Sequence, residues 1–200
     1  MSHLLHRRDF LRAFGQTVLG ASALGIAGLS CKQASACATP PPPVCRATAA
    51  NIEGPFFKAN APKRSVLVEP KDPGERFVLT GRVLSGGCIP VASALVEIWH
   101  ADASGAYDNV GDHFRGVLET DARGEYKLQT ILPGRYLNGR KFRPAHIHAK
   151  VHIPGRPSLT TQLYFEGDPE NRGDPFIVDS LIMAHRFEGR VRTAHFDFVV

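Results

Sequence analysis

Two histidines, His146 and His148, lie two residues apart in the run Arg143-Pro144-Ala145-His146-Ile147-His148. Side chains alternate between the two faces of an extended strand, so both imidazoles point the same way while Ile147 and Ala149 belong to an apolar opposite face. Two imidazoles about 7 Å apart along a strand can converge on one metal ion. The same spacing also occurs on ordinary amphipathic strands with half-exposed histidines, so the pair alone leaves both interpretations open.

Two tyrosines lie in segments that are expected to be loops. Tyr107 follows Ala103-Ser104-Gly105-Ala106, and Tyr136 ends the run Leu132-Pro133-Gly134-Arg135 shortly before the histidine pair. Loops on a rigid β scaffold often present functional groups, although a loop tyrosine is more often a packing residue. Each tyrosine alone is therefore a weak candidate for chemistry.

Short extended segments must position these side chains. Runs rich in β-branched and aromatic residues, separated by Gly, Pro, Asp and Ser, predict strands over residues 77–84, 94–101, 117–120, 126–131, 145–153, 160–165 and 192–200. The turn Asp121-Ala122-Arg123-Gly124 predicts that residues 117–120 and 126–131 form a hairpin. Helix should be minor, with one turn around residues 179–185. The pattern predicts an all-β fold, an antiparallel sandwich or barrel with little helix.

The net charge excludes one class of partner. The 200 residues carry a formal charge of +5, from 24 basic and 19 acidic side chains. Without residues 1–36, which hold four basic residues and one acidic residue, 20 basic and 18 acidic residues remain, a net charge of +2. So small an excess gives no electrostatic footprint for nucleic acid, and we expect none as a partner.

The N-terminus has the features of a targeting segment. Arg7-Arg8-Asp9-Phe10-Leu11-Arg12 precedes a charge-free stretch over residues 13–30 and the small-residue pattern Ala34-Ser35-Ala36. The paired arginines resemble a twin-arginine signal, which predicts export across the cytoplasmic membrane to the periplasm or beyond. An ordinary secretory signal, a retained anchor, or a lipid-anchored protein beginning at Cys31 are the alternatives.

The domain organisation follows from composition. Residues 1–36 are the expected signal peptide, residues 37–50 form a linker that contains Pro40-Pro41-Pro42-Pro43, and residues 51–200 form one domain. Export places the remaining cysteines in an oxidising compartment. We expect Cys45 to pair with Cys88 and leave Cys37 over, although spacing alone does not determine the pairing.

The whole pattern resembles the intradiol ring-cleaving dioxygenases, the catechol and protocatechuate family. The matching segments, in chain order, are Glu53-Gly54-Pro55-Phe56-Phe57; Pro90 to Asp102 with Gly105-Ala106-Tyr107; Thr120-Asp121 with Gly124-Glu125-Tyr126; Thr130-Ile131-Leu132-Pro133; Arg143 to His148; and Thr160 to Phe165 with Gly167-Asp168-Pro169. So many ordered matches over about 120 residues are a much stronger signal than any one of them.

The resemblance implies a non-haem Fe(III) cofactor with four protein ligands: Tyr107, Tyr136, His146 and His148. Ferric iron favours anionic oxygen and accepts imidazole, and a bound cation favours the deprotonated form of a phenol. The resemblance further implies that Tyr136 gives way to substrate, that Arg143 stabilises negative charge growing on the substrate ring, and that the Gln162 amide positions ligand and substrate near the metal.

The implied reaction inserts both atoms of O2 into a catechol between the two hydroxyl-bearing carbons and yields a muconate-type diacid. The long N-terminal helical segment of catechol-type members is missing, so the domain is nearer to protocatechuate-type subunits or compact exported members, as a homo-oligomer or with a homologous subunit. Which catechol is the substrate stays open. Arg135, Arg140 and Lys141 are equally consistent with binding a ring carboxylate and with being solvated loop charges.

Two other classes compete with this interpretation. A secreted β-sandwich binding module could have kept the scaffold without the chemistry. An exported zinc or copper enzyme could use only His146 and His148, although zinc sites usually take Cys, His or carboxylate ligands rather than tyrosine.

Overall fold

The computed structural model describes residues 44–200 of the chain. The expected signal peptide, Cys31, Cys37 and residues 37–43 of the expected linker lie outside the described residues. The described residues form an all-β fold, as predicted, in which helix is limited to two short 3-10 turns, η1 (Pro169–Arg172) and η2 (Asp179–Leu181). None of the helices within residues 44–200 is long and apolar enough to cross a membrane.

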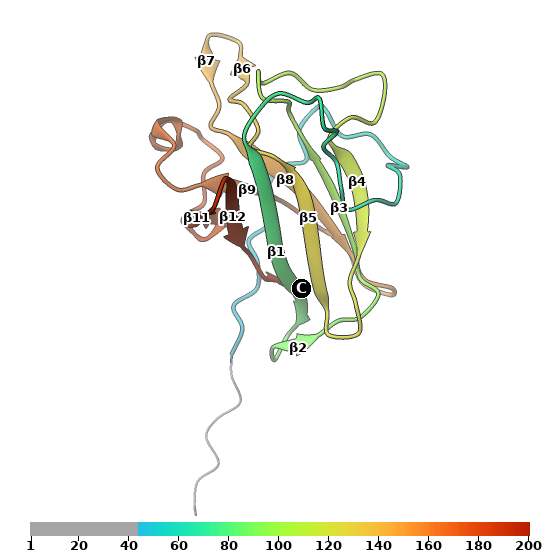
Figure 1. The fold of residues 1–200 in the computed structure, drawn as a ribbon. Coiled ribbons are helices and arrows are strands. Elements are labelled where there is room, and N and C mark those ends of the chain that lie inside the picture. Colours follow the sequence, from blue (N-terminus) through green and yellow to red (C-terminus); the bar gives the residue numbers. More distant parts are fainter. Residues whose placement is uncertain (1–43) are drawn as a thin grey trace, which may run out of the picture. The chain divides into compact units, whose positions relative to one another are not determined.

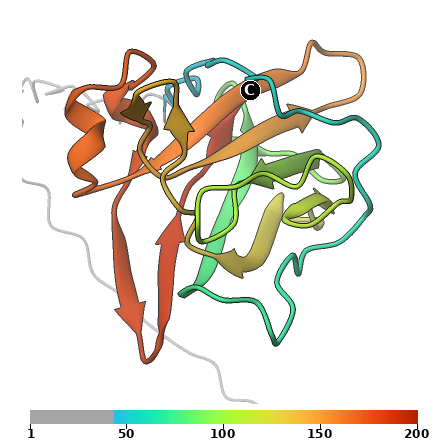
Figure 2. The ribbon, with the colours of Figure 1, turned by 90° about the horizontal axis from the view of Figure 1, so that it is seen from above.

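Two sheets make up the body of the fold (Figure 1). The six-stranded sheet is built around β1 and contains β1 (Arg76–Ser85), β2 (Ile89–Pro90), β5 (Glu125–Ile131), β11 (His185–Glu188), β12 (Val191–His195) and β13 (Phe198–Val199). The five-stranded sheet has, in spatial order, β10 (Ile182–Met183), β9 (Leu159–Phe165), β8 (His146–His152), β3 (Leu95–His100) and β4 (Arg115–Glu119). A separate small hairpin pairs β6 (Leu137–Asn138) with β7 (Lys141–Phe142). The view from above shows this hairpin beside the loop between β3 and β4 (Figure 2).

Most of the strand pairs are antiparallel, as expected, but three are parallel. β1 runs parallel to both β12 and β13, and β9 runs parallel to β10. All of these involve strands from the last quarter of the chain, which returns to the edges of sheets that earlier strands have already formed. The fold is therefore a mixed sandwich rather than a purely antiparallel one.

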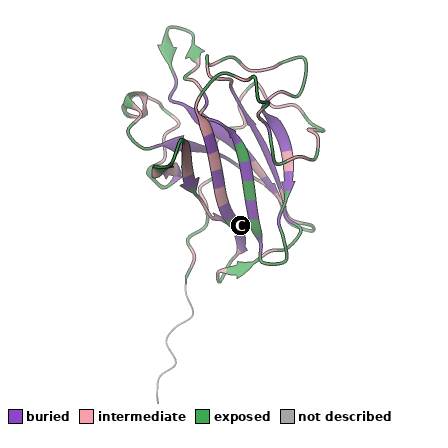
Figure 3. Ribbon diagram, in the orientation of Figure 1, coloured by how far each residue is buried: buried purple, intermediate pink, exposed green. Residues whose placement is uncertain are grey.

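The core lies between the two sheets. Along β5 every second side chain is buried, with Tyr126 and Leu128 inward and Glu125 and Lys127 exposed (Figure 3). This period of two is what a strand with one face on the core requires. A contact between aromatic rings whose centroids lie 5.2 Å apart, Phe77 of β1 and Phe165 of β9, joins the two sheets directly.

The expected strands before residue 166 are confirmed, with each predicted end within two residues of the observed one. The expected helical turn around residues 179–185 is confirmed only over Asp179–Leu181, because the chain continues into β10 and β11. The η1 turn was not predicted, since Pro169 and the preceding Asp168, whose carboxylate caps Glu170, read as ordinary turn residues.

The predicted hairpin over residues 117–131 is wrong. The turn itself forms, since the Asp121 carboxylate accepts the backbone N–H groups of Arg123 and Glu125. However, β4 pairs with β3 in one sheet, whereas β5 pairs with β1 in the other. The Thr120 hydroxyl, which donates to the Val91 carbonyl and accepts from the Ala94 N–H, holds the end of β4 beside β3. The turn is therefore a corner between sheets.

The predicted C-terminal strand is interrupted. Between β12 and β13 the Phe196 carbonyl passes so close to Gly81 that a Cβ there would lie 1.8 Å from its oxygen. That carbonyl accepts the Tyr126 hydroxyl at 2.7 Å, and the Asp197 carboxylate takes the Arg82 N–H that a continuous ladder would use. Because Gly81 has no side chain, the last segment can pass close to β1, and it pairs with β1 as two separate strands, β12 and β13.

The chain joins the folded unit before Asn51. The expected disulfide between Cys45 and Cys88 is confirmed. The Thr48 N–H donates to the Val199 carbonyl, and the Ala49 carbonyl accepts the Thr161 hydroxyl. Residues 45–50, which composition places in the linker, are therefore held by a covalent bond and by hydrogen bonds that composition does not reveal.

We expect reduction of this disulfide, or the double change Cys45→Ser and Cys88→Ser, to lower the free energy of unfolding by up to about 4 kcal/mol, the chain-entropy value for a loop of this length. The sequence separation of the two cysteines is 43 residues. Urea unfolding with and without a reductant measures the change. An unchanged midpoint would contradict this expectation.

Candidate metal centre

The histidine pair lies on a central strand, β8, with both side chains buried. His146 and His148 are 3% and 2% exposed on one face, and Ile147 on the opposite face belongs to the core. The register aligns His148 with Trp99 of β3 and with Gln162 of β9. The Trp99 indole stacks on the His148 ring at 4.7 Å with an interplanar angle of 6°. The expectation that both imidazoles share a face is confirmed, and neighbouring strands fix the ring of His148.

Two loops at the same end of the sandwich supply the tyrosines. Tyr107 lies between β3 and β4, and Tyr136 lies between β5 and β6. The loops touch where Gly105, at φ +91°, meets the Arg135 carbonyl, and a Cβ there would lie 2.2 Å from that oxygen. The Gly134 N–H also donates to the Asp102 carbonyl. Glycine at position 105 thus allows the close approach that brings the two phenols together.

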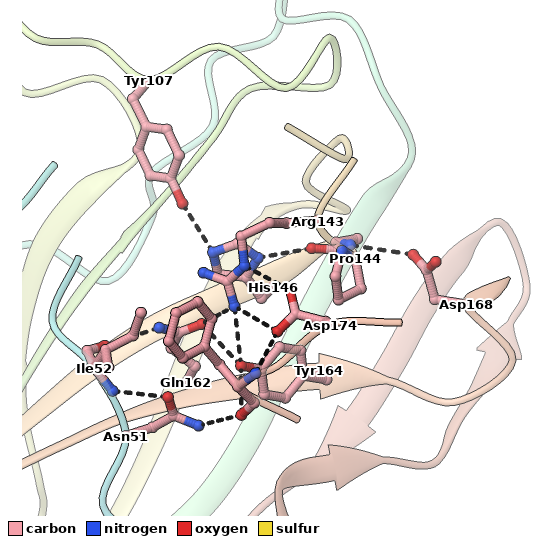
Figure 4. A network of polar contacts seen from close by, with 12 residues as sticks. Asn51, Ile52, Tyr107, Arg143, Pro144, His146, Gln162, Tyr164, Asp168 and Asp174 are labelled. Atoms are coloured by element: carbon pink, nitrogen blue, oxygen red, sulfur yellow. Dashed lines mark hydrogen bonds and ion pairs between the residues drawn. The ribbon is translucent and has the colours of Figure 1, made fainter. Parts of the chain in front are cut away.

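Four rings converge at this point. The Tyr107 hydroxyl is 3.2 Å from Nε2 of His146 (Figure 4). Ring centroids are separated by 4.9 Å for His146 and His148, 5.8 Å for Tyr107 and Tyr136, 6.0 Å for Tyr136 and His146, and 6.1 Å for Tyr107 and His148. Residues from three separate segments therefore form one cluster of oxygen and nitrogen donors.

The surroundings favour the uncharged forms of His146, His148 and Tyr107 in the protein alone. Burial, followed by the charge of Arg143, lowers the pKa of His146 to about 4. Burial and the neighbouring His146 lower the pKa of His148 well below its ordinary value. Burial is also the main cause that raises the pKa of Tyr107, and the charges of Arg143 and Arg115 oppose it only in part. At neutral pH the cluster offers lone pairs on neutral imidazoles.

The donor set fits a hard cation. Nδ1 of His146 is 2.7 Å from the Pro144 carbonyl, so it carries the proton and leaves the Nε2 lone pair facing Tyr107. Nδ1 of His148 is buried with no hydrogen-bond partner in the described part of the chain. No group of three His, Cys, Asp or Glu side chains within residues 44–200 could hold a metal ion. The further donors around the imidazoles are phenols, which suit Fe(III).

Arg143 lies beside the cluster in a buried polar network (Figure 4). Its Nε donates to the Asp174 carboxylate at 2.6 Å, and its Nη2 donates to Gln162 Oε1 at 3.0 Å and to the Tyr164 hydroxyl. Although burial opposes its charge, the hydrogen bond and charge of Asp174 raise the pKa of Arg143. The Gln162 amide donates to the Ile52 carbonyl at 2.8 Å, so its orientation is fixed as well.

The structure brings all six predicted site residues together, and it adds others that sequence reasoning missed. Asp174 stands in Gly173-Asp174-Pro175, which reads as a turn, yet its side chain is 1% exposed and pairs with Arg143. Phe56, which belongs to a matched motif but had no assigned role, stacks on the Tyr107 ring at 4.2 Å. A Cβ at Gly54 would lie 3.2 Å from Cε1 of His148, so the main chain itself covers that imidazole.

The three basic loop residues, Arg135, Arg140 and Lys141, differ in their contacts. Arg135 is paired, because its Nε donates to both oxygens of the buried Asp168 carboxylate at 3.0 and 3.1 Å. Arg140 and Lys141 are exposed and line, with Arg143 and Phe176, a cavity of about 710 Å³. Arg135 is therefore the least available of the three to a ligand.

Comparison with known proteins shows which family the chain belongs to. The dioxygenase family model matches residues 52–200, which is most of the described chain. The chain belongs to the intradiol dioxygenase family.

Individual relatives agree with this assignment. The chain is 32% identical over 178 residues to chlorocatechol 1,2-dioxygenase of Pseudomonas putida, covering 78% of this chain and 68% of that protein. It is 42% identical over 118 residues to the protocatechuate 3,4-dioxygenase beta chain of Burkholderia cepacia, which is about half of each protein. The dioxygenase domain of a dioxygenase and carbohydrate-binding protein fusion from Streptomyces sp. SirexAA-E superposes with a TM-score of 0.74 at 42% identity, covering 78% of this chain and 98% of that one.

Buried histidines predict how this intradiol dioxygenase responds to acid. Burial lowers the pKa of His100, like that of His146, to about 4, against about 6.5 in the unfolded chain. Between these values the unfolded chain binds more protons, so the free energy of unfolding falls as pH drops from 6.5 to 4. We expect a loss of about 3 kcal/mol per histidine in the metal-free protein, measured by urea unfolding at several pH values.

One variant separates this effect from general acid sensitivity. His100→Gln should make the decline between pH 6.5 and 4 shallower, because it removes one of the two buried imidazoles. Equal slopes in the wild type and in His100→Gln would contradict the assignment.

Proposed function

We propose that this chain is a non-haem Fe(III) dioxygenase that cleaves a catechol-type aromatic between its two hydroxyl-bearing carbons and yields a muconate-type diacid. Both atoms of O2 enter the product. Tyr107, Tyr136, His146 and His148 would hold the metal. When bound, Fe(III) supplies a Lewis-acid centre that binds a deprotonated catechol and makes its ring reactive towards O2.

The observation that supports this proposal most is the convergence of two phenols and two neutral imidazoles beside a fixed, buried guanidinium. Burying two neutral imidazoles beside two phenols lowers the stability of the protein in acid. A binding module would have no need of such an arrangement. Ferric iron is a common biological metal that accepts both anionic oxygen and imidazole ligands.

Arg143 would stabilise negative charge on the ring. A guanidinium is charged at every relevant pH, and its donors have a fixed geometry. Asp174, Gln162 and Tyr164 occupy part of its hydrogen-bonding capacity, and the Phe176 ring lies 4.7 Å from its Cζ atom. The group is therefore held in place before substrate arrives, which is the condition for electrostatic stabilisation of a transition state.

Tyr136 would be the exchangeable ligand. It is half-buried at the rim, next to the exposed hairpin β6–β7, and the Arg143 N–H donates to its carbonyl. When a catechol binds through both oxygens, the displaced phenolate can accept one of the two catechol protons. The Phe56 ring stacks face to face on Tyr107 at 4.2 Å but meets the Tyr136 ring only edge-on at 5.6 Å, so Tyr107 is the more closely covered of the two.

Export and assembly belong to this proposal as well. We propose that the protein acts in the periplasm or outside the cell, a location that the twin-arginine pattern and the disulfide Cys45–Cys88 support. A lipid anchor at Cys31 is the alternative. The relative named as a beta chain supports association with a homologous subunit, in a homo- or hetero-oligomer.

We expect the iron-loaded protein to absorb visible light through tyrosinate-to-iron charge transfer, and the band to move to longer wavelength when catechol is added without oxygen. Admission of air should then consume O2 and form the diacid. The measurement is an anaerobic absorption titration followed by oxygen uptake and product identification by mass spectrometry.

A pair of tyrosine variants controls this experiment. Tyr136→Phe should lose part of the band and slow turnover by about 100-fold or more, because the proton acceptor is gone. Tyr126→Phe changes a buried tyrosine outside the cluster, bonded to the Phe196 carbonyl, and should keep the band. A colourless, folded, iron-supplied wild type would exclude the proposal, leaving a binding module or a zinc enzyme.

A second prediction concerns the counterion of Arg143. We expect Asp174→Asn to lower kcat by about tenfold to 100-fold with a smaller effect on KM, because the guanidinium is no longer held in one orientation. Breaking this buried pair should also cost about 3 kcal/mol of stability. Steady-state kinetics and urea unfolding measure both quantities. Glu170→Gln, on the wall of the same cavity, is the control and should change neither.

A further inference from the structure

Arg115 is a fully buried cation whose hydrogen bonds, among the described residues, all go to main-chain carbonyls. It is 2% exposed at the start of β4. Its Nε and Nη2 donate to the Asp108 carbonyl at 3.2 and 2.8 Å, and its Nη1 donates to the Phe56 carbonyl at 2.7 Å. Within residues 44–200 no carboxylate forms an ion pair with it, whereas the buried Arg143 has Asp174. A buried guanidinium bonded only to carbonyls is costly, so its presence calls for a reason.

The two carbonyls that Arg115 binds both belong to the support of Tyr107. Asp108 follows Tyr107 directly, so the two bonds to its carbonyl fix the main chain one residue beyond the tyrosine. Phe56 contributes the ring that stacks on the Tyr107 ring, at 4.2 Å and an interplanar angle of 11°. One side chain therefore fixes Tyr107 through its own main chain and through the ring that covers it.

Nearby acidic groups are already engaged elsewhere. The Asp108 carboxylate accepts the backbone N–H groups of Val110, Gly111 and His113, and these bonds lower its pKa to about 2. The Asp112 side chain lies 3.7 Å from Lys58. Within residues 44–200, every hydrogen bond of the Arg115 guanidinium therefore goes to the main chain that supports Tyr107.

We propose that Arg115 is a positioning residue that holds Tyr107 in place as the fixed ligand of the metal, through the Asp108 and Phe56 carbonyls. The inference rests on the proposed function, because it assigns Tyr107 to a metal-bound state. It explains why two chemically identical ligands differ. A buried guanidinium holds the support of Tyr107, whereas among the described residues no arginine side chain donates to the main chain on either side of Tyr136.

The experiment isolates Tyr107 by using the Tyr136→Phe background, in which one tyrosinate remains. Arg115→Gln, Arg115→Lys and Arg64→Lys are introduced separately into this iron-loaded protein. Arg64 is the matched control, since it also donates to main-chain carbonyls near β4, those of Arg115 and Asp112, but not to the carbonyls of Asp108 and Phe56. The readouts are the position of the tyrosinate-to-iron band and the rate of iron loss to a chelator at pH 7.

A positive charge near a phenolate lowers the energy of its donor electrons, so removal of that charge should shift the band to longer wavelength. We expect this shift in Arg115→Gln, together with about 10- to 100-fold weaker iron binding, the range found when the partner of a metal ligand is removed. Arg115→Lys should keep the band near its original position but lose iron faster, because it keeps the charge without the forked carbonyl contacts. Arg64→Lys should change neither.

Each outcome has a separate meaning. If Arg115→Gln does not fold, the lysine variant still tests the clamp through the iron-loss rate. Wild-type band position and iron-loss rate in both folded Arg115 variants, or the same changes in Arg64→Lys, would overturn the inference and leave the proposed function intact. Absence of any charge-transfer band in the unmodified protein would instead overturn the proposed function.

Discussion

The register between three adjacent strands determines the rest of the site. In the ladder β3–β8–β9, Trp99, His148 and Gln162 lie side by side, and a slip of one residue would turn both histidines of β8 to the opposite face. The apolar residues Ile147, Ala149 and Val151 prevent such a slip, because they must stay in the core. The packing of the sandwich and the placement of the imidazoles are therefore consequences of one pattern of alternation.

The wall of the site comes from a segment that has no regular structure of its own. Residues 51–57 cross the end of the sheet and contribute the Ile52 carbonyl to Gln162, the Gly54 main chain to His148 and the Phe56 ring to Tyr107. An irregular segment keeps one position only when its ends and its polar groups are held. The disulfide at Cys45 and the hydrogen bonds of residues 48–51 hold one end, and Arg115 holds the carbonyl of Phe56 at the other.

Patterns within short stretches of sequence predicted the strands and the direction of their side chains. The strands up to residue 165 and the shared face of His146 and His148 follow from alternation, and ordered motifs identified Tyr107, Tyr136, Arg143 and Gln162. The hairpin at Asp121 was mispredicted because a turn motif specifies the bend and not which sheet each strand joins. Asp174 and Arg115 were missed because a polar residue next to glycine or proline, or at the start of a strand, carries no sign of burial. Their roles arise from contacts across 31 and 59 residues of sequence.

Two buried arginines with different partners give the site its asymmetry. Arg143 pairs with Asp174 and bonds to Gln162, so its guanidinium is held in one orientation beside the four rings. Arg115 forms no ion pair within the described residues and donates only to main-chain carbonyls, so it holds the support of Tyr107 in place. On the proposed function, the tyrosine whose support is held is the ligand that stays, and Tyr136 at the half-buried rim is the ligand that leaves when substrate binds. The different roles of two identical side chains thus follow from how firmly the protein holds the main chain around each of them.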